Sequence, residues 1–469
     1  MSVHIPADVI SRLKAVLGEG GWSEDPDRLA PKLVEWRDRW SGMTPLLALP
    51  KTTEEVAAVV GICAAAGVPI TPQGGNTGLV GGQIPQGEIL LSTERLNRVR
   101  EVDPADDVLA AEAGVTLAAA HEAAAEAGRR FPLSVASEGS ATVGGLISTN
   151  AGGVAVMRYG TMRDLVLGIE AVLPNGKVWN GLKRLRKDNT GVDLKQLLIG
   201  AEGVLGVVTA ATLKLFPILP SRATAYAAVE SPAAAVALLV KAKETTGGGV
   251  ESFELISGFG MELAVRALPG ARWPLEGRPP WYALIETASG EAGAAEAGME
   301  RLLEQGFEAG LVLDAAIAQT ETQGKAFWAL REIQSAAEKP EGAAWKHDIS
   351  VPVSRISEFL DRAGQLLEAR FPGVRIDAFG HVGDGNIHYD VLSAKDADQT
   401  QHLARRDEAA RVVHDLVVSL GGSISAEHGL GIMKTAEAAA YKSEAELEAL
   451  RAIRTALDPG RIMNPRVLF

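Results

Sequence analysis

The sequence predicts an α+β protein of two or three domains. Its 469 residues exceed a single small module, because one domain typically takes about 150 residues. From Pro45 onward, short apolar strands alternate with alanine-rich helices, a pattern typical of layered α/β or α+β structure. The 51 glycines indicate many tight turns or places where the backbone approaches a ligand. The prolines of LKLFPILPS predict a domain boundary near residue 220.

The individual elements follow from hydrophobic periodicity and turn residues. Residues 1–43 form a charged, tryptophan-containing preamble that we expect to be helical. The next helix has Thr53 as its expected N-cap, valines on one face, and Gly67 as its end. The same mixture of helices and strands returns after residue 220, which predicts a second α+β domain. The expected helices are Thr52–Ala66, Pro232–Lys243, Gly293–Gln305 and Ser443–Leu457, and the expected strands are Val68–Thr71, Trp281–Thr287, Val374–Phe379, Ile387–Val391 and Ser423–Ser425.

Charge and cysteine content argue against several classes of protein. The 46 Lys and Arg residues against 59 Asp and Glu give a net charge of −13, which repels polyanions, so we expect no nucleic-acid partner. The single cysteine, Cys63, forbids an intrachain disulfide and fits a reducing compartment. The N-terminal segment has no apolar signal core, and no apolar run reaches about 18 residues. We therefore expect a cytoplasmic protein without a membrane span.

Two glycine clusters suggest a site for a long, phosphate-containing ligand. In TPQGGNTGLVGG, residues 71–82, successive backbone N–H groups can converge without Cβ atoms in the way, as in an anion-binding nest that suits a diphosphate. The second cluster, residues 137–153, offers hydroxyl and amide side chains such as Ser140 as further donors. A third glycine-containing run begins at Gly200 and continues into a β-branched strand. The GxGxxG and GxxxxGK[ST] fingerprints are both absent.

The segment RIDAFGHVGDGNIHYDV, residues 375–391, predicts a hairpin that carries two histidines. Two strand-like runs flank Asp384-Gly385, and a two-residue Asp-Gly connection favours a type I′ turn. Counting back from that turn pairs His381 with His388, whose Cβ atoms would then lie about 4.5–5.5 Å apart. This register places two imidazoles side by side, ready to chelate one metal ion.

Two carboxylates are expected near the histidine pair. In SISAEHGLG, residues 423–431, we expect a strand that ends at Glu427-His428. With the two histidines, Glu427 would form a set that leaves coordination positions open, as catalytic zinc sites do. Zn²⁺ is the first expectation, and Mn²⁺ and Fe²⁺ remain open. Asp390 falls on the same face of the hairpin, one pleat beyond His388, where it would contact substrate or orient a ligand.

Two cations further upstream suit a carboxylate ligand. The helical run AFWALREIQSAAE places Arg331 and Ser335 four residues apart and hence on one face. Arg331 offers a planar fork for bidentate carboxylate binding, although an isolated arginine on a helix more often carries a solvated charge. Lys346 enters a strand-like run that ends at Pro352.

The glycine motifs carry a resemblance to a known superfamily. PQGGNTGLVGG, ASEGSATVGGLISTNAGG, GAEGVLGVVT and the closing IMNP resemble the FAD-binding domain of the vanillyl-alcohol-oxidase and p-cresol-methylhydroxylase superfamily, over most of residues 45–220 and again at the C-terminus. The resemblance implies an extended FAD with its diphosphate on the first glycine loop. Some members attach the flavin to a histidine near that loop, where this chain has Gly75 and Asn76 and its nearest histidine is His121, so we expect non-covalent FAD. The implied cofactor-binding residues are Pro72, Gln73, Gly74, Gly75, Asn76, Thr77, Gly78, Gly81, Gly82, Ser137, Glu138, Gly139, Thr142, Gly144, Gly145, Ser148, Asn150, Gly153, Tyr159, Gly160, Glu202, Gly203, Gly206, Val207, Val208 and Asn464.

The histidine motifs extend the resemblance over nearly the whole chain. HVGDGNIH and SAEHGLG resemble the C-terminal domain of the flavin-dependent D-2-hydroxyacid dehydrogenases, and WALRE and WKHDISVP match the pattern of the D-2-hydroxyglutarate-oxidising members. This resemblance implies that His428 is the catalytic base. The chain departs from the family at Asp390, where asparagine is familiar, and at Ser335, where threonine is; a carboxylate at 390 would repel an anionic substrate unless it is protonated or faces a cation. The implied metal ligands are His381, His388 and Glu427, and the expected substrate contacts are Arg331, Ser335, Lys346, Asp390 and Asn386.

These resemblances imply a specific domain plan. After the preamble of residues 1–43, residues 44–220 are expected to form a two-subdomain FAD-binding domain of p-cresol-methylhydroxylase type, and residues 221–415 an α+β substrate domain with the metal site. Residues 416–469 are expected to form a helical segment that returns to the FAD domain and completes both sites.

The implied activity is FAD- and metal-dependent oxidation of a D-2-hydroxyacid to the 2-oxoacid. D-2-hydroxyglutarate is the first expectation and D-malate the second. The alternatives are a D-lactate or glycolate dehydrogenase, a transferase similar to alkylglycerone-phosphate synthase, and a non-catalytic flavoprotein subunit. The electron acceptor remains open between an electron-transfer flavoprotein, a quinone and oxygen, and a homodimer is the default oligomer.

Overall fold

The chain folds into two compact units. The computed structural model describes residues 5–468. Unit 1 takes in the chain up to Gly153, Tyr159–Ile218 and the chain from Glu427, and unit 2 takes in Val154–Arg158 and Leu219–Ala426. The division after Ile218 lies close to the boundary expected near residue 220. No helix within residues 5–468 is both long and apolar enough to cross a membrane.

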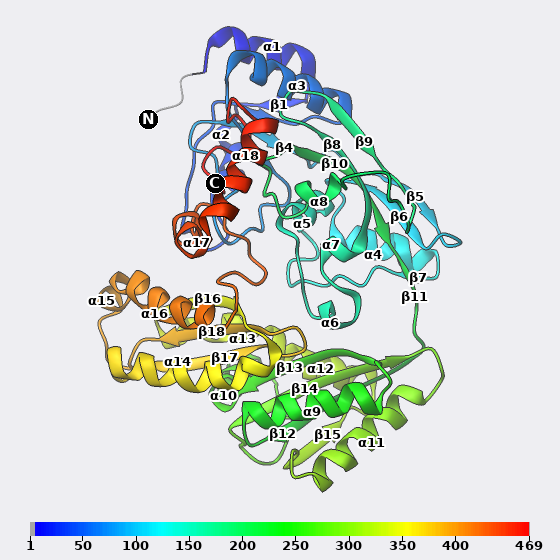
Figure 1. The fold of residues 1–469 in the computed structure, drawn as a ribbon, viewed down its shortest axis with the longest axis vertical. Helices are drawn as coiled ribbons and strands as arrows, with labels where there is room; N and C mark the ends of the chain where they lie inside the picture. The colour runs from blue at the N-terminus through cyan, green and yellow to red at the C-terminus, as the bar shows by residue number, and fades with distance from the viewer. Residues whose placement is uncertain (1–4, 469) are drawn as a thin grey trace. The chain divides into compact units, whose positions relative to one another are not determined.

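Unit 1 is built on two main sheets (Figure 1). A four-stranded sheet has the order β1-β2-β4-β3, and a five-stranded antiparallel sheet has the order β5-β6-β10-β8-β9. The preamble is not wholly helical, because β1 pairs with β2. The elements are α1 (Ala7–Leu17), β1 (Trp22–Ser23), α2 (Pro26–Leu33), β2 (Leu47–Ala48), α3 (Thr53–Ala66), β3 (Ile70–Gln73), β4 (Ile89–Ser92), β5 (Val99–Asp103), β6 (Val108–Glu112), α4 (Leu117–Glu126), β7 (Arg129–Arg130), α5 (Val143–Thr149), α7 (Met162–Leu165), β8 (Val166–Val172), β9 (Val178–Gly181), α8 (Lys195–Leu198), β10 (Val207–Lys214), β11 (Phe216–Pro217), α17 (Thr435–Tyr441) and α18 (Glu444–Leu457), and α6 (Val156–Tyr159) spans the change of unit.

Helix α3 shows why the sequence forms these elements. Its N-cap is Thr52 rather than the expected Thr53, and the Thr52 side chain accepts a hydrogen bond from the backbone N–H of Glu55. The Thr53 hydroxyl instead donates to Glu170 Oε1 at 2.7 Å. Gly67 ends the helix with φ +65°, as glycine permits at this position. The buried face of α3, including Cys63, packs into a core with α1 and the four-stranded sheet.

Unit 2 is a seven-stranded antiparallel sheet in the order β15-β12-β14-β13-β17-β18-β16. The expected strand Ser423–Ser425 is reduced to a single bridge between Ser423 and Ser350. The elements are β12 (Ser221–Val229), α9 (Pro232–Thr245), β13 (Val250–Ser257), α10 (Gly258–Ala267), β14 (Trp281–Ser289), α11 (Ala294–Glu308), β15 (Asp314–Ile317), α12 (Glu321–Glu332), α13 (Gln334–Ala337), η1 (Lys339–Glu341), β16 (Ala344–Ser350), η2 (Val353–Arg355), α14 (Ile356–Arg370), β17 (Arg375–His381), β18 (Asn386–Leu392), α15 (Gln399–Ala404) and α16 (Arg406–Ser419).

The two faces of this sheet differ in chemistry. Alternate residues of a strand point to opposite faces. One set, exemplified by Phe253, Ala378 and Tyr389, packs against α9, α11, α14 and α16 in a large apolar core. The other set, exemplified by Phe379, packs at one end against α10 and α12. Along β13, β17, β18 and β16 this second face carries polar side chains, which are Glu254, Asp377, His381, Asn386, His388, Asp390, Lys346 and Asp348.

The β17–β18 hairpin has a longer turn than its Asp-Gly pair predicts. Residues 382–385 form a four-residue turn in which the N–H groups of Asp384 and Gly385 both donate to the His381 carbonyl. His388 is consequently opposite Phe379, so the expected pairing of His381 with His388 is wrong by two residues. Because side chains alternate with a period of two, a shift of two residues keeps both histidines on the same face.

Gly385 is the residue in this turn that we expect to be irreplaceable. Its φ is +90°, and a Cβ would lie 2.1 Å from the Val351 carbonyl oxygen. Gly385→Ala should therefore lower the free energy of unfolding of unit 2 by about 2–6 kcal/mol, from backbone strain and overpacking together.

Gly373→Ala is the matched control for this prediction. Gly373 has φ +81°, but a Cβ there would meet its nearest atom at an ordinary 3.6 Å, so about 1 kcal/mol is expected. Calorimetric unfolding of both variants measures the difference. Equal losses of Tm would contradict the tight packing of this turn.

Candidate functional site

The first two glycine clusters pack against each other in unit 1. A Cβ on Gly74 would lie 2.3 Å from Thr142 Oγ1, and a Cβ on Gly75 would lie 1.8 Å from the Ser140 carbonyl oxygen. Both glycines are therefore required by close packing. A cavity of about 400 Å³ opens beside them and is lined in part by Gly74, Gly75, Ser140 and Thr142. The Thr142 hydroxyl is buried and has no hydrogen-bond partner within residues 5–468, which suits a site for a polar ligand.

Several predicted cofactor residues have structural partners of their own. Asn464 donates from its side-chain amide to the carbonyl oxygens of Gly82 and Glu202, at 3.0 and 2.9 Å. The closing IMNP motif therefore ties the first and third glycine runs together, as the expected return of the C-terminus to this domain requires. The Glu202 carboxylate accepts from the backbone N–H groups of Leu430 and Gly431, both at 2.8 Å. Burial raises the pKa of Glu202, against the lowering effect of those two hydrogen bonds.

Other predicted cofactor residues hold loop geometry. Asn76, at φ +55°, donates to the carbonyl oxygens of Pro31 and Val34. Gln73 donates to the carbonyl oxygens of Lys32 and Gln83, while its own side-chain oxygen is buried without a donor from the described part of the chain. These contacts bring the predicted segments together, and direct contact of each residue with a cofactor stays a prediction.

The two histidines lie on neighbouring strands of unit 2 with their rings close together. The ring centroids of His381 and His388 are 5.9 Å apart, at an interplanar angle of 74°. His381 ends β17, and His388 lies in β18 opposite Asp348 of β16. The predicted association of the two rings is therefore present, although through a diagonal rather than a direct pairing.

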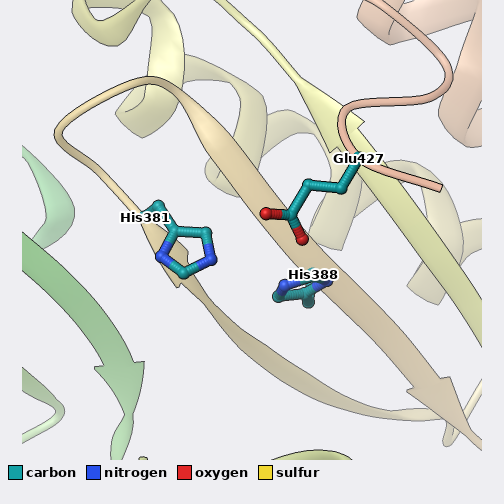
Figure 2. Close-up of side chains that lie close together, drawn as sticks. All are labelled: His381, His388 and Glu427. Carbon is teal, nitrogen blue, oxygen red and sulfur yellow. The ribbon is translucent and has the colours of Figure 1, made fainter. Parts of the chain in front are cut away.

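Glu427 lies beside the histidine pair. His381, His388 and Glu427 each present a ligand atom within 4.8 Å of the others, and Figure 2 shows the carboxylate turned towards both rings. Glu427 directly follows Ala426, whose N–H donates to the Asp348 carbonyl at 3.3 Å and so fixes this stretch on β16. Asp348, Glu427 and His428 form a second close group. Two imidazoles and a carboxylate fit a divalent cation such as Zn²⁺ by donor type.

Glu254 is a site residue that sequence reasoning missed. It connects the histidine pair to Arg331. Glu254 in β13 is directly opposite His381 in β17, and its Oε1 lies 2.5 Å from His381 Nδ1. Its Oε2 accepts from Arg331 Nε at 2.6 Å. Burial opposes ionisation of Glu254, but the charges of His381 and Arg331 outweigh it and hold the pKa of the carboxyl at about 2. A carboxylate at Nδ1 leaves Nε2 of His381 as the atom for a metal.

Asp390 faces a cation, which is one of the two conditions under which a carboxylate at this position would not repel an anionic substrate. In the sheet register Asp390 is opposite Lys346 of β16 on one side and Asp377 of β17 on the other. Lys346 Nζ lies 2.8 Å from Asp390 Oδ2 and 2.7 Å from Glu338 Oε2. Burial opposes ionisation of Asp390, but the charge of Lys346 lowers its pKa. Burial and the charge of Asp390 together raise the pKa of both Glu338 and Asp377.

The expected helical face of Arg331 and Ser335 is wrong. Helix α12 ends at Glu332, Ile333 forms a turn, and Ser335 belongs to the separate short helix α13. Arg331 is buried whereas Ser335 is exposed, and the Ser335 carbonyl oxygen lies 3.5 Å from Lys346 Nζ. Asn386, also expected near the substrate, is buried and donates to Asp348 Oδ1 and the Ile349 carbonyl.

Two family descriptions match the chain. The C-terminal domain of FAD-linked oxidases matches residues 218–468, and an FAD-binding domain matches residues 44–181. The mitochondrial D-2-hydroxyglutarate dehydrogenase of Arabidopsis thaliana is 37% identical over 97% of this chain and 80% of that protein. The D-2-hydroxyglutarate dehydrogenase of Xanthomonas citri pv. viticola is 36% identical over 93% of this chain and 91% of that protein.

Solved structures support the fold. The crystal structure of p-cresol methylhydroxylase with substrate bound covers 98% of this chain and 96% of its own, with a TM-score of 0.77 at 17% identity. The predicted α+β architecture with a p-cresol-methylhydroxylase type of FAD-binding fold is confirmed. The roles of the individual site residues stay predictions.

Replacement of Glu254 tests its link to the histidine pair. Glu254→Gln removes the negative charge that orients His381, so we expect affinity for a divalent metal to fall by about 10–100-fold. Metal content per chain after dialysis against graded chelator measures this loss.

Glu251→Gln provides the matched control. Glu251 lies in the same strand, is equally buried and is ion-paired to Arg222 and Arg158. Both variants should lose thermal stability, and only Glu254→Gln should lose metal. Equal metal retention in the two variants would contradict the role of Glu254.

Proposed function

Because the chain belongs to the FAD-linked oxidases, we propose that it is an FAD-dependent dehydrogenase that oxidises a D-2-hydroxyacid to the 2-oxoacid. D-2-hydroxyglutarate, which both relatives above carry in their names, is the first candidate substrate, and D-malate is the second. The observation that carries the proposal is the group of His381, His388 and Glu427, with His428 next in the chain.

FAD is proposed to bind without a covalent link beside Gly74 and Gly75. The cavity there, the two close-packed glycine clusters and the Thr142 hydroxyl, which is buried without a partner among the described residues, support this assignment. The loop of residues 71–82 contains no His, Cys or Tyr that could attach a flavin. Bound FAD supplies a two-electron acceptor for the hydride of the substrate C2.

The residues proposed to hold a divalent cation are His381, His388 and Glu427. Their donor types suit Zn²⁺ first, with Mn²⁺ and Fe²⁺ as the alternatives. A cation there supplies Lewis acidity that lowers the pKa of a bound hydroxyl. Glu254 keeps His381 in the tautomer with Nε2 free, and Asp348 is opposite His388 in the neighbouring strand.

His428 is proposed to take the proton of the substrate 2-hydroxyl. Imidazole has an ordinary pKa of about 6.5, so a neutral ring can accept a proton near pH 7. Its neighbours Asp348 and Glu427 present carboxylate oxygens close to the ring, which would stabilise the imidazolium once it forms. Arg331 and Lys346 are the cations proposed to face the distal end of the substrate.

The proposal extends to the partners of the reaction. We propose an electron-transfer flavoprotein or a quinone as the acceptor that reoxidises the flavin, and a homodimer as the oligomeric state. A cytoplasmic location stays a prediction, since the Arabidopsis thaliana relative is named as mitochondrial.

Anaerobic bleaching of the purified protein near 450 nm tests the function. We expect a D-2-hydroxyacid from a panel of D-2-hydroxyglutarate, D-malate, D-lactate and glycolate to bleach the flavin rapidly. EDTA should abolish that bleaching, and an added divalent metal should restore it, because the 2-hydroxyl then regains its Lewis acid.

The other outcomes of this experiment separate the parts of the proposal. Bleaching that EDTA leaves unchanged would remove the metal from catalysis while the FAD-dependent oxidation stands. A flavin that none of the four compounds reduces would contradict D-2-hydroxyacid oxidation itself.

A further inference from the structure

The ammonium of Lys346 is fully occupied by groups of this chain. Its Nζ lies 2.7 Å from Glu338 Oε2, 2.8 Å from Asp390 Oδ2 and 3.5 Å from the Ser335 carbonyl oxygen. A lysine ammonium has three N–H donors, so these three acceptors account for all of them. Both carboxylate side chains are at most 3% exposed. Asp390 alone neutralises the charge of Lys346.

Sheet register makes this pairing a fixed part of the fold. Asp390 in the middle strand β18 is directly opposite Lys346 in β16. Opposite residues of an antiparallel pair have Cβ atoms about 4.5–5.5 Å apart, so their side chains meet without a long reach. The register itself therefore holds Asp390 within reach of Lys346.

Arg331 is paired in the same way. Its Nε donates to Glu254 Oε2 at 2.6 Å, and the arginine is 8% exposed. The two cations expected to bind a second substrate carboxylate thus already face the carboxyl groups of Glu254, Glu338 and Asp390. The charges of Arg331 and Lys346 are thus matched by the carboxylates of Glu254 and Asp390 before an anion arrives, and a desolvated charge without a partner is costly to bind.

The surroundings of Lys346 also hold a buried acceptor that lacks a donor. Among the residues that the structure describes, the side-chain oxygen of Gln334 is buried without a hydrogen-bond donor. A Cβ on Gly260 would lie within 2.8 Å of both Asp377 Oδ1 and Gln334 Oε1, which shows that these two side chains are neighbours. Buried acceptors of this kind favour a donor and disfavour another acceptor.

We infer that this chain selects D-2-hydroxyacids whose distal group is uncharged and donates hydrogen bonds, and that Asp390 is the residue that disfavours a distal carboxylate. The inference rests on the proposed function and reorders its candidate substrates. A carboxamide has the shape of a carboxylate but offers two N–H donors to the acceptors around Lys346.

An isosteric pair of substrates tests the inference on the unmodified holoenzyme. D-2-hydroxyglutaramate differs from D-2-hydroxyglutarate only in carrying a carboxamide in place of the distal carboxylate. We expect its kcat/KM for flavin reduction to equal or exceed that of D-2-hydroxyglutarate. A kcat/KM at least tenfold higher for the diacid would overturn the inference.

Asp390→Asn tests the residue itself. Because Glu338 would ionise beside Lys346 once the Asp390 charge is gone, Asp390→Asn is combined with Glu338→Gln. In this double variant the charge of Lys346 is free, so the ratio of kcat/KM for the diacid to that for the amide should rise at least tenfold, mainly through the KM of the diacid. Asp377→Asn is the control, because Asp377 also lies opposite Asp390 and is buried but contacts Ser257 rather than Lys346. In Asp377→Asn the ratio of kcat/KM for the diacid to that for the amide should change less than threefold.

The outcomes distinguish the inference from the function on which it rests. A flavin that neither compound nor any other D-2-hydroxyacid reduces would overturn the proposed function, and the inference with it. Reduction by both compounds with an unchanged ratio in the double variant would leave the function standing and overturn the role of Asp390. If the variant fails to fold, the comparison of D-2-hydroxyglutaramate with D-2-hydroxyglutarate on the unmodified protein still tests the preference for an uncharged distal group.

Discussion

The buried carboxylate of Glu254 is the interaction on which the polar face of unit 2 depends. Its two oxygens bind different elements, His381 Nδ1 at the end of β17 and Arg331 Nε in α12. A fully buried carboxylate persists only when cations and hydrogen bonds satisfy it, and here both partners do so. The orientation of a predicted metal ligand and the position of a predicted substrate contact are therefore set by one side chain.

The antiparallel sheet supplies the rest of the geometry. Its cross-strand pairs bring together residues that are distant in sequence, such as Glu254 with His381 and Lys346 with Asp390. The opposite face is an apolar core against α9, α11, α14 and α16, which fixes the register because a slip of one residue would bury the polar set. A rigid sheet thus holds the charged groups in defined rows.

Sequence reasoning found the elements that depend on local signals. The Asp384-Gly385 turn and the period of two were enough to put His381 and His388 on one face, but the register was wrong by two residues because the turn takes four residues. The break at Ile333, which separates Arg331 from Ser335, has no glycine or proline to mark it.

Long-range partners were beyond the reach of sequence reasoning. Glu254 could have been noticed as an acidic residue between Phe253 and Leu255 in an apolar strand, but its partners lie 77 and 127 residues further along the chain. The contact of Lys346 with Asp390 depends likewise on two strands that are not consecutive.

The most direct test of this account is anomalous diffraction from crystals of the zinc-loaded protein. We expect one strong peak at about 2.0–2.2 Å from His381 Nε2, a nitrogen of His388 and a carboxylate oxygen of Glu427. A peak on the alternative group of Asp348, Glu427 and His428, or no ordered metal at either group, would contradict it.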